Sequence, residues 1–147
     1  MDLYTQIYNI LMGESNPKDK SNELTNLLNT INKIKSKINR STAGYYGPQI
    51  TNLENKKFLI MDEISSYNFY LKNKNSNNNF DLHEMYGYQI NSVLDAIFDY
   101  CILKEIKSFH IITGNGNVIK PKVIKYLKYF NVSFKFINNG LLNVNKY

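Results

Sequence analysis

The chain has 147 residues, of which 43 % are hydrophobic and 20 % are charged, so it can bury a core and is not disordered by composition. This length predicts one domain, or a small domain with an extension. No apolar run approaches the roughly 20 residues of a membrane-spanning helix, and the single cysteine excludes an intramolecular disulfide framework and a cysteine-cluster zinc site. The formal net charge of +6 favours anionic partners such as nucleic acid or a ribosomal surface.

Lysine carries almost all of the positive charge, because Arg40 is the only arginine. A guanidinium fork on a phosphate would therefore depend on this one residue. The opening residues MDLYTQIYNILMG have no basic n-region and no small-residue cleavage site, so a signal peptide is not expected. Together with the cysteine content, this predicts a reducing, cytoplasmic setting.

Three helices are predicted in the first half of the chain, because apolar residues recur there every three or four positions. They cover residues 2–12, 22–39 and 49–72. Ser21 is expected to cap the second helix, and Pro48 is expected in the first turn of the third, after a break at 41–47.

A polar, asparagine-rich tract at 73–79 marks the predicted domain boundary. Residues 1–79 are expected to be a helical extension with its linker, and residues 80–147 an α/β domain. In the second part, strands are predicted at 80–83, 108–113, 133–137 and 141–145, and helices at 88–105 and 119–130. The order βαβαββ predicts a small mixed sheet packed with two helices.

The tetrapeptide FDLH at 80–83 alternates apolar and polar side chains, which point to opposite faces of a strand. The apolar pair is expected to face the helices. Asp81 and His83 are therefore expected to lie together on the accessible side. A carboxylate beside an imidazole suits general acid–base chemistry.

A glycine loop, GNGN at 114–117, follows the second predicted strand. A βαβ crossover makes the first two strands parallel, so their carboxyl ends share one edge of the sheet, where open α/β sheets bind ligands. The loop also leads into a helix N-terminus, whose free N–H groups attract phosphate. An acid–base pair beside such a cradle predicts a site that handles a phosphodiester.

Three segments in this order resemble the Smr (small MutS-related) domain family. The family shows a DLHG motif, a TGxG or HGxG loop, and a following helix that often begins with a basic residue and proline. The corresponding segments are FDLH at 80–83, IITGNGN at 111–117 and IKPKVIKYL at 119–127, and GLLNV at 140–144 is similar to the last strand of the family.

The resemblance covers residues 80–147 and implies a fold similar to the C-terminal domain of translation initiation factor three. Residues 22–74 more faintly resemble the helical extension that precedes many eukaryotic Smr domains. Smr proteins include DNA-nicking enzymes and RNA endonucleases that cut messenger RNA on stalled or collided ribosomes.

Carried over by position, Asp81 and His83 match the family's DLH pair and are the expected catalytic residues. The expected nucleic-acid-binding residues are Thr113, Gly114, Asn115, Gly116, Asn117, Lys120 and Lys122. Two positions depart from the family, since Glu84 replaces the glycine of DLHG and Asn115 stands where the loop often has arginine or lysine. The charge of a transition state would then be met by Lys120, by backbone N–H groups or by the ribosome.

The resemblance implies an Smr-type hydrolase that binds RNA at ribosomes in messenger RNA surveillance and cleaves its phosphodiester backbone as an endonuclease. On RNA, one of Asp81 and His83 would take the proton of the 2′-OH while the other protonates the leaving oxygen. No cofactor is required by this route, and a divalent metal, with Glu84 as a further carboxylate, is left open.

Two alternatives stay open. One is a catalytically degenerate Smr module that acts as a ribosome-bound binding or dormancy factor. The other is a DNA-nicking protein, which the lack of an accompanying MutS ATPase region disfavours. No membrane partner is expected, and the sequence makes no prediction of the oligomeric state.

Other residues have a structural interpretation beside a functional one. His110 alternates with apolar neighbours and is expected to be structural, and Cys101 falls on an apolar stripe and is expected in the core. Tyr86 and Tyr88 could stack on bases, but packing is the favoured role. A basic C-terminal region, with no acidic residue after Glu105, is formed by Lys120, Lys122, Lys125, Lys128, Lys135 and Lys146.

Overall fold

The computed structural model describes residues 1–39, 41–73 and 78–146, and it divides into two compact units. One unit is Lys18–Ile64, and the other combines Met1–Pro17 with Ser65–Tyr147. Arg40 and most of the predicted linker, residues 74–77, lie outside the described residues. The domain boundary at residue 79 stays a prediction.

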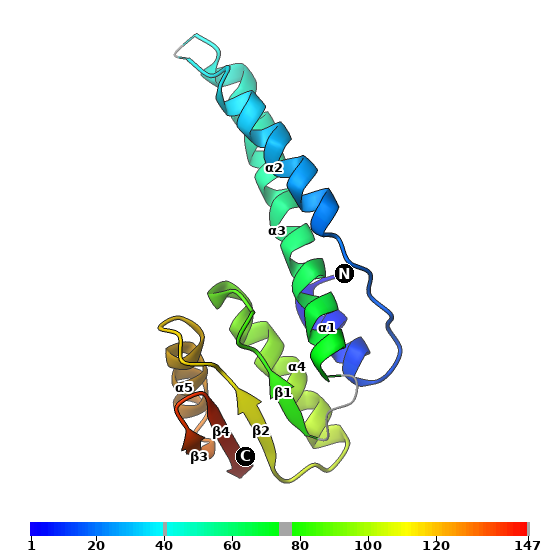
Figure 1. The fold of residues 1–147 in the computed structure, drawn as a ribbon, viewed down its shortest axis with the longest axis vertical. Coiled ribbons are helices and arrows are strands. Elements are labelled where there is room, and N and C mark those ends of the chain that lie inside the picture. Colours follow the sequence, from blue (N-terminus) through cyan, green and yellow to red (C-terminus); the bar gives the residue numbers. More distant parts are fainter. Residues whose placement is uncertain (40, 74–77, 147) are drawn as a thin grey trace. The chain divides into compact units, whose positions relative to one another are not determined.

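The unit Lys18–Ile64 is a pair of helices. Helix α2 (Ser21–Lys35) lies alongside the first part of α3 (Ala43–Asn73) in Figure 1. Leu27, Ile31 and Ile60 are buried between them, and Lys35 forms an ion pair with Glu54 at 2.9 Å.

Two predicted helix starts are wrong. The third helix begins at Ala43 and not at Gln49, so that Pro48 lies inside it. A turn forms ahead of the proline because the side chain of Asn39 accepts hydrogen bonds from the backbone N–H groups of Ser41 and Thr42. Ser21 is not the cap of α2 but its first residue, and its backbone N–H donates to Asp19.

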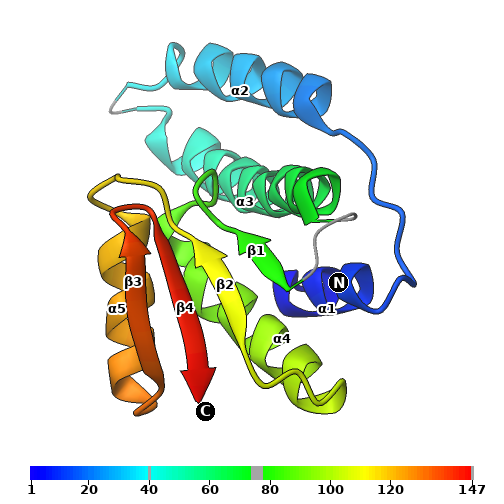
Figure 2. The same ribbon diagram turned by 60° about the horizontal axis from the view of Figure 1, so that its bottom comes forward.

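The other unit is built on a four-stranded mixed sheet with the strand order β1-β2-β4-β3 (Figure 2). Its strands are β1 (Asn79–Asp81), β2 (Phe109–Ile112), β3 (Ser133–Asn138) and β4 (Leu141–Lys146). The first two strands are parallel, and β4 runs antiparallel to both β2 and β3. The predicted α/β fold with its βαβαββ order is therefore confirmed.

Helices cover one face of this sheet, as Figure 2 shows for α4 (Ile90–Leu103) and α5 (Ile119–Tyr129). The short 3₁₀ helix η1 (Gly87–Gln89) precedes α4, and α1 (Leu3–Leu11) packs on α4. The sheet residues buried in this core alternate along the strands as predicted and are Phe80, Leu82, Phe109, Ile111, Leu142 and Val144.

Cys101 lies fully buried in the same core, as expected from the apolar stripe of α4. Burial disfavours the thiolate and raises the pKa of this thiol to about 12. Among the described residues, no helix combines the length and the apolar character needed to cross a membrane.

Candidate nucleic-acid site

The carboxyl ends of β1 and β2 meet at one edge of the sheet. Asp81 is the register partner of Ile112 in the parallel ladder, and the backbone N–H of Leu82 donates to the carbonyl of Ile112 at 2.9 Å. The segment that carries His83 and the loop that begins at Thr113 therefore leave the sheet side by side, as the predicted crossover requires.

Asp81 and His83 are in direct contact. The imidazole Nδ1 of His83 lies 2.5 Å from Oδ1 of Asp81, and the same oxygen accepts the backbone N–H of His83 at 3.1 Å. The Asp81 side chain is 18 % exposed and that of His83 42 % exposed. A carboxylate that accepts from Nδ1 fixes the orientation of the imidazole, so that Nε2 lies on the side of the ring away from Asp81.

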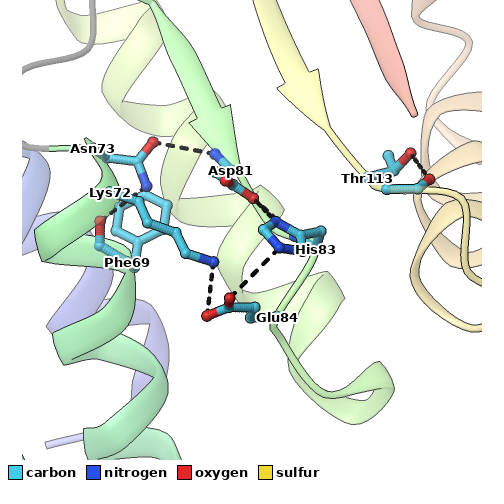
Figure 3. A network of polar contacts seen from close by, with 8 residues as sticks. Phe69, Lys72, Asn73, Asp81, His83, Glu84 and Thr113 are labelled. Carbon is cyan, nitrogen blue, oxygen red and sulfur yellow. Dashed lines mark hydrogen bonds and ion pairs between the residues drawn. The ribbon is translucent and has the colours of Figure 1, made fainter. Parts of the chain in front are cut away.

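A second carboxylate stands on the Nε2 side of the ring (Figure 3). Oε1 of Glu84 lies 3.5 Å from His83 Nε2, and Oε2 of Glu84 forms an ion pair with Lys72 Nζ at 2.8 Å. The imidazole is directed toward Asp81 and Glu84, and Thr113 lies on the other side of the histidine in this view. Glu84 thus adds one negative charge beside the imidazole, and Lys72 offsets it.

The last turn of α3 also holds the end of β1. The Asn73 side chain accepts the backbone N–H of Asp81 at 3.1 Å and donates to the carbonyl of Phe69 at 2.9 Å (Figure 3). Phe69 is itself buried in the core. The free edge of β1 is therefore closed by a side chain, and the backbone of Asp81 is fixed from outside the sheet.

Gly114 permits the close approach of the loop to His83. Its φ is +67°, and a Cβ at this position would lie 3.1 Å from the Cβ of His83. On the other side, a Cβ on Gly140 would lie 3.2 Å from the backbone of Gly114. The segment of His83, the loop at Gly114 and the turn at Gly140 thus meet at this edge, and the last two approach closely because they have glycine at the contact.

The loop residues differ in what they can offer to a phosphate. The Thr113 side chain is buried, and its hydroxyl donates to the carbonyl of Gly114. The backbone N–H groups of Thr113 and Gly114 both donate to the carbonyl of Gly140. The remaining candidates are the N–H groups of Asn115, Gly116 and Asn117 and those of the first turn of α5, which no side chain caps.

The two predicted lysine contacts lie in different places. Lys120 lines a hollow with Asn115, Gly116 and Asn117, and its Nζ stands 5.0 Å from the centre of the Phe136 ring. Lys122 instead faces the 3₁₀ helix, where a Cβ on Gly87 would lie 3.0 Å from its Cε. Of these two predicted residues, Lys120 is therefore the one that lines the same hollow as the loop.

Sequence reasoning missed Lys72, Asn73 and Gly140. Lys72 ends the predicted third helix and Asn73 begins the predicted polar tract at 73–79, and no periodic signal connects the end of a helix to a strand beyond such a tract. Gly140 had a visible signal, since the turn Asn138-Asn139-Gly140 was predicted, but its contact with Gly114 depends on the strand order.

His110 has a hydrogen-bond partner in the neighbouring strand, because its Nδ1 lies 2.9 Å from the side-chain oxygen of Asn79. Within the described part of the chain, no three His, Cys, Asp or Glu side chains are arranged to hold one metal ion.

The comparisons with known proteins agree with the geometry of this edge. The family model described as "Smr domain" matches residues 80–136, a range that contains the Asp81–His83 pair, the glycine loop and α5. Neither the curated proteins nor the solved structures gave a significant match. Residues 80–136 of this chain therefore match the Smr domain family, and the βαβαββ fold agrees with that match.

Proposed function

We propose that this protein binds RNA through its Smr domain and cleaves the phosphodiester backbone, in association with the ribosome. The domain supports nucleic-acid binding in general. The observation that carries the finer proposal is the Asp81–His83 contact at 2.5 Å, with the Cβ of His83 against Gly114 at the start of the loop.

The contacts between Asp81 and His83 support a different role for each residue in this proposal. Both hydrogen bonds from His83 go to the carboxylate of Asp81, so Asp81 orients the ring and stabilises an imidazolium. His83 Nε2 then serves as the general base that takes the proton of a ribose 2′-OH. The sequence left open which of the two residues takes the proton, and we assign this role to His83.

The cleavage step follows as an internal displacement. The 2′-oxygen bonds to phosphorus and the 5′-oxygen leaves, giving a 2′,3′-cyclic phosphate and a 5′-hydroxyl. Water protonates the departing oxygen, and the imidazolium returns its proton to solvent. Negative charge that develops on the phosphoryl oxygens is met by Lys120 and by the backbone N–H groups from Asn115 onward.

The proposal predicts that cleavage requires the 2′-OH. End-labelled RNA, the same sequence with 2′-O-methyl groups, and the corresponding DNA are incubated with the purified full chain, and products are resolved on a gel. We expect cleavage of the RNA only, with 2′,3′-cyclic phosphate ends, and none by the Asp81→Ala/His83→Ala variant. Undiminished cleavage by that variant rejects these roles, and preferential nicking of supercoiled plasmid supports the DNA-acting alternative.

Glu84 favours a second candidate, a module that occupies an RNA or ribosomal site without cutting. Its carboxylate lies on the side of the ring where the substrate oxygen must approach, 3.5 Å from Nε2, and would repel a phosphate. Salt-sensitive RNA or ribosome binding by the wild-type chain without cleavage, together with cleavage by Glu84→Gly, would support this candidate.

A further inference from the structure

Helix α5 is flanked by two hollows that meet at its C-terminal end. The first lies between α4 and α5 and is lined in part by Tyr88, Asn91, Asp95 and Tyr129. The second runs from the glycine loop along α5 and includes Lys120 and Lys128. Lys125 and Tyr129 line both hollows, so that a continuous surface leads from the candidate site to the end of the helix.

The segment that contains Gly87 connects the first hollow to the candidate site. A Cβ on this residue would lie 2.9 Å from Cγ1 of Val118, so the segment that follows His83 and Glu84 packs directly on the start of α5. The buried side chain of Met85 anchors the same segment in the core. Tyr88 is thereby placed at the rim of the hollow, 49 % exposed.

The chemistry of the first hollow suits a nucleobase. Its volume of about 370 Å³ falls in the range of small-ligand sites. Tyr88 and Tyr129, the latter 78 % exposed, supply aromatic surface on which a base can stack. The Asn91 amide supplies both a donor and an acceptor of hydrogen bonds.

Asp95 places a carboxylate in the lining of the hollow. Its Oδ1 accepts the hydroxyl of Tyr126 at 2.5 Å, which fixes the carboxylate in place, and an ionised carboxylate accepts several hydrogen bonds. Such a group repels a phosphate and accepts from the exocyclic amino group of a base. Lys122 and Lys125 at the rim are positioned to contact the phosphates on either side.

The outer face of α5 complements a nucleic-acid backbone. Lys122, Lys125 and Lys128 are exposed on it, and no acidic residue follows Glu105 in the chain. The buried residues of the helix, such as Val123 and Leu127, occupy the opposite face. The helix therefore presents lysines outward beside a hollow that contains aromatic and amide groups.

We infer that a single-stranded RNA leaves the candidate site along the lysine face of α5 and inserts one amino-bearing base, cytosine, adenine or guanine, into the hollow between α4 and α5. This inference rests on the proposed function for the site that the strand leaves. It assigns Tyr88 and Tyr129 to base stacking, and Asn91 and Asp95 to recognition of the base edge.

The test measures affinity alone, so that it does not depend on cleavage. Fluorescein-labelled oligo(C) and oligo(U), which differ at the amino or carbonyl group of position 4, are titrated with the Asp81→Ala/His83→Ala chain and followed by anisotropy. We expect tighter binding of oligo(C). Adding Tyr129→Leu or Tyr88→Leu is expected to weaken that binding by about five- to a hundredfold.

Tyr45→Leu in the same background is the matched control, because Tyr45 is 69 % exposed and lies in the unit Lys18–Ile64. It is expected to leave the affinity unchanged, and circular dichroism checks the fold of each variant. Equal affinities for oligo(C) and oligo(U), or unchanged binding by both the Tyr88→Leu and the Tyr129→Leu variant, would overturn the inference alone. Absence of binding to any RNA by the wild-type chain would overturn the proposed function as well.

Discussion

Replacing His83 with alanine is expected to lower the rate of RNA cleavage by about 10²- to 10⁴-fold, the usual contribution of a general base. RNA affinity should change by no more than about threefold, because the lysines and loop N–H groups that hold the phosphates remain. Single-turnover cleavage with saturating protein and anisotropy with uncleavable 2′-O-methyl RNA measure the two effects separately.

His110→Ala provides the matched control, since the chain has two histidines. His110 lies in β2 with its Nδ1 bonded to Asn79, outside the Asp81–His83 pair. We expect this variant to cut RNA at the wild-type rate when the protein is folded. A large loss of cleavage with His110→Ala and none with His83→Ala would contradict the assignment and make His110 the general base.

Gly114→Ala is expected to lower both the free energy of unfolding and the rate of cleavage. A left-handed backbone costs an alanine about 1–2 kcal/mol. The new Cβ would also lie 3.1 Å from that of His83, so the histidine must shift away from the loop. We expect a loss of cleavage of at least about tenfold, because the reacting groups need near-ideal placement. Urea unfolding and single-turnover cleavage are the measurements.

The Gly13→Ala variant is the control that distinguishes the effect of backbone strain from the effect of displacing His83. Gly13 has a φ of +75°, close to that of Gly114, but no atom lies within 4 Å of its added Cβ. It should lose about the same 1–2 kcal/mol of unfolding free energy and keep full cleavage activity. If both glycine variants lose activity equally, the loss follows from destabilisation, and the contact between Gly114 and His83 has no part in it.

The alternation of side chains predicted the α/β domain well because each strand buries one face. Phe80 and Leu82 lie in the core and Asp81 and His83 do not, as the strand period requires. The parallel pairing of β1 and β2 followed from the crossover rule, and it places the ends of both strands at one edge.

The contacts around the imidazole could not be predicted in the same way. The Lys72–Glu84 ion pair joins a helix to a loop across residues 74–77, and tertiary packing alone decides such a contact. The sequence also does not show that Thr113 turns its hydroxyl inward to Gly114, which leaves the later loop residues to face a phosphate. The start of α3 was misplaced because local capping by Asn39 allows a helical turn before Pro48.

The proposed function requires that the Asp81–His83 pair and the glycine loop hold the same phosphodiester. A titration of the ¹⁵N-labelled chain with a 2′-O-methyl RNA dinucleotide, followed by NMR, tests it most directly. We expect the His83 imidazole signals and the amide signals of Gly116 and Asn117 to shift together with one dissociation constant. Shifts of the loop amides with an unmoved His83 imidazole, or of neither, would contradict it.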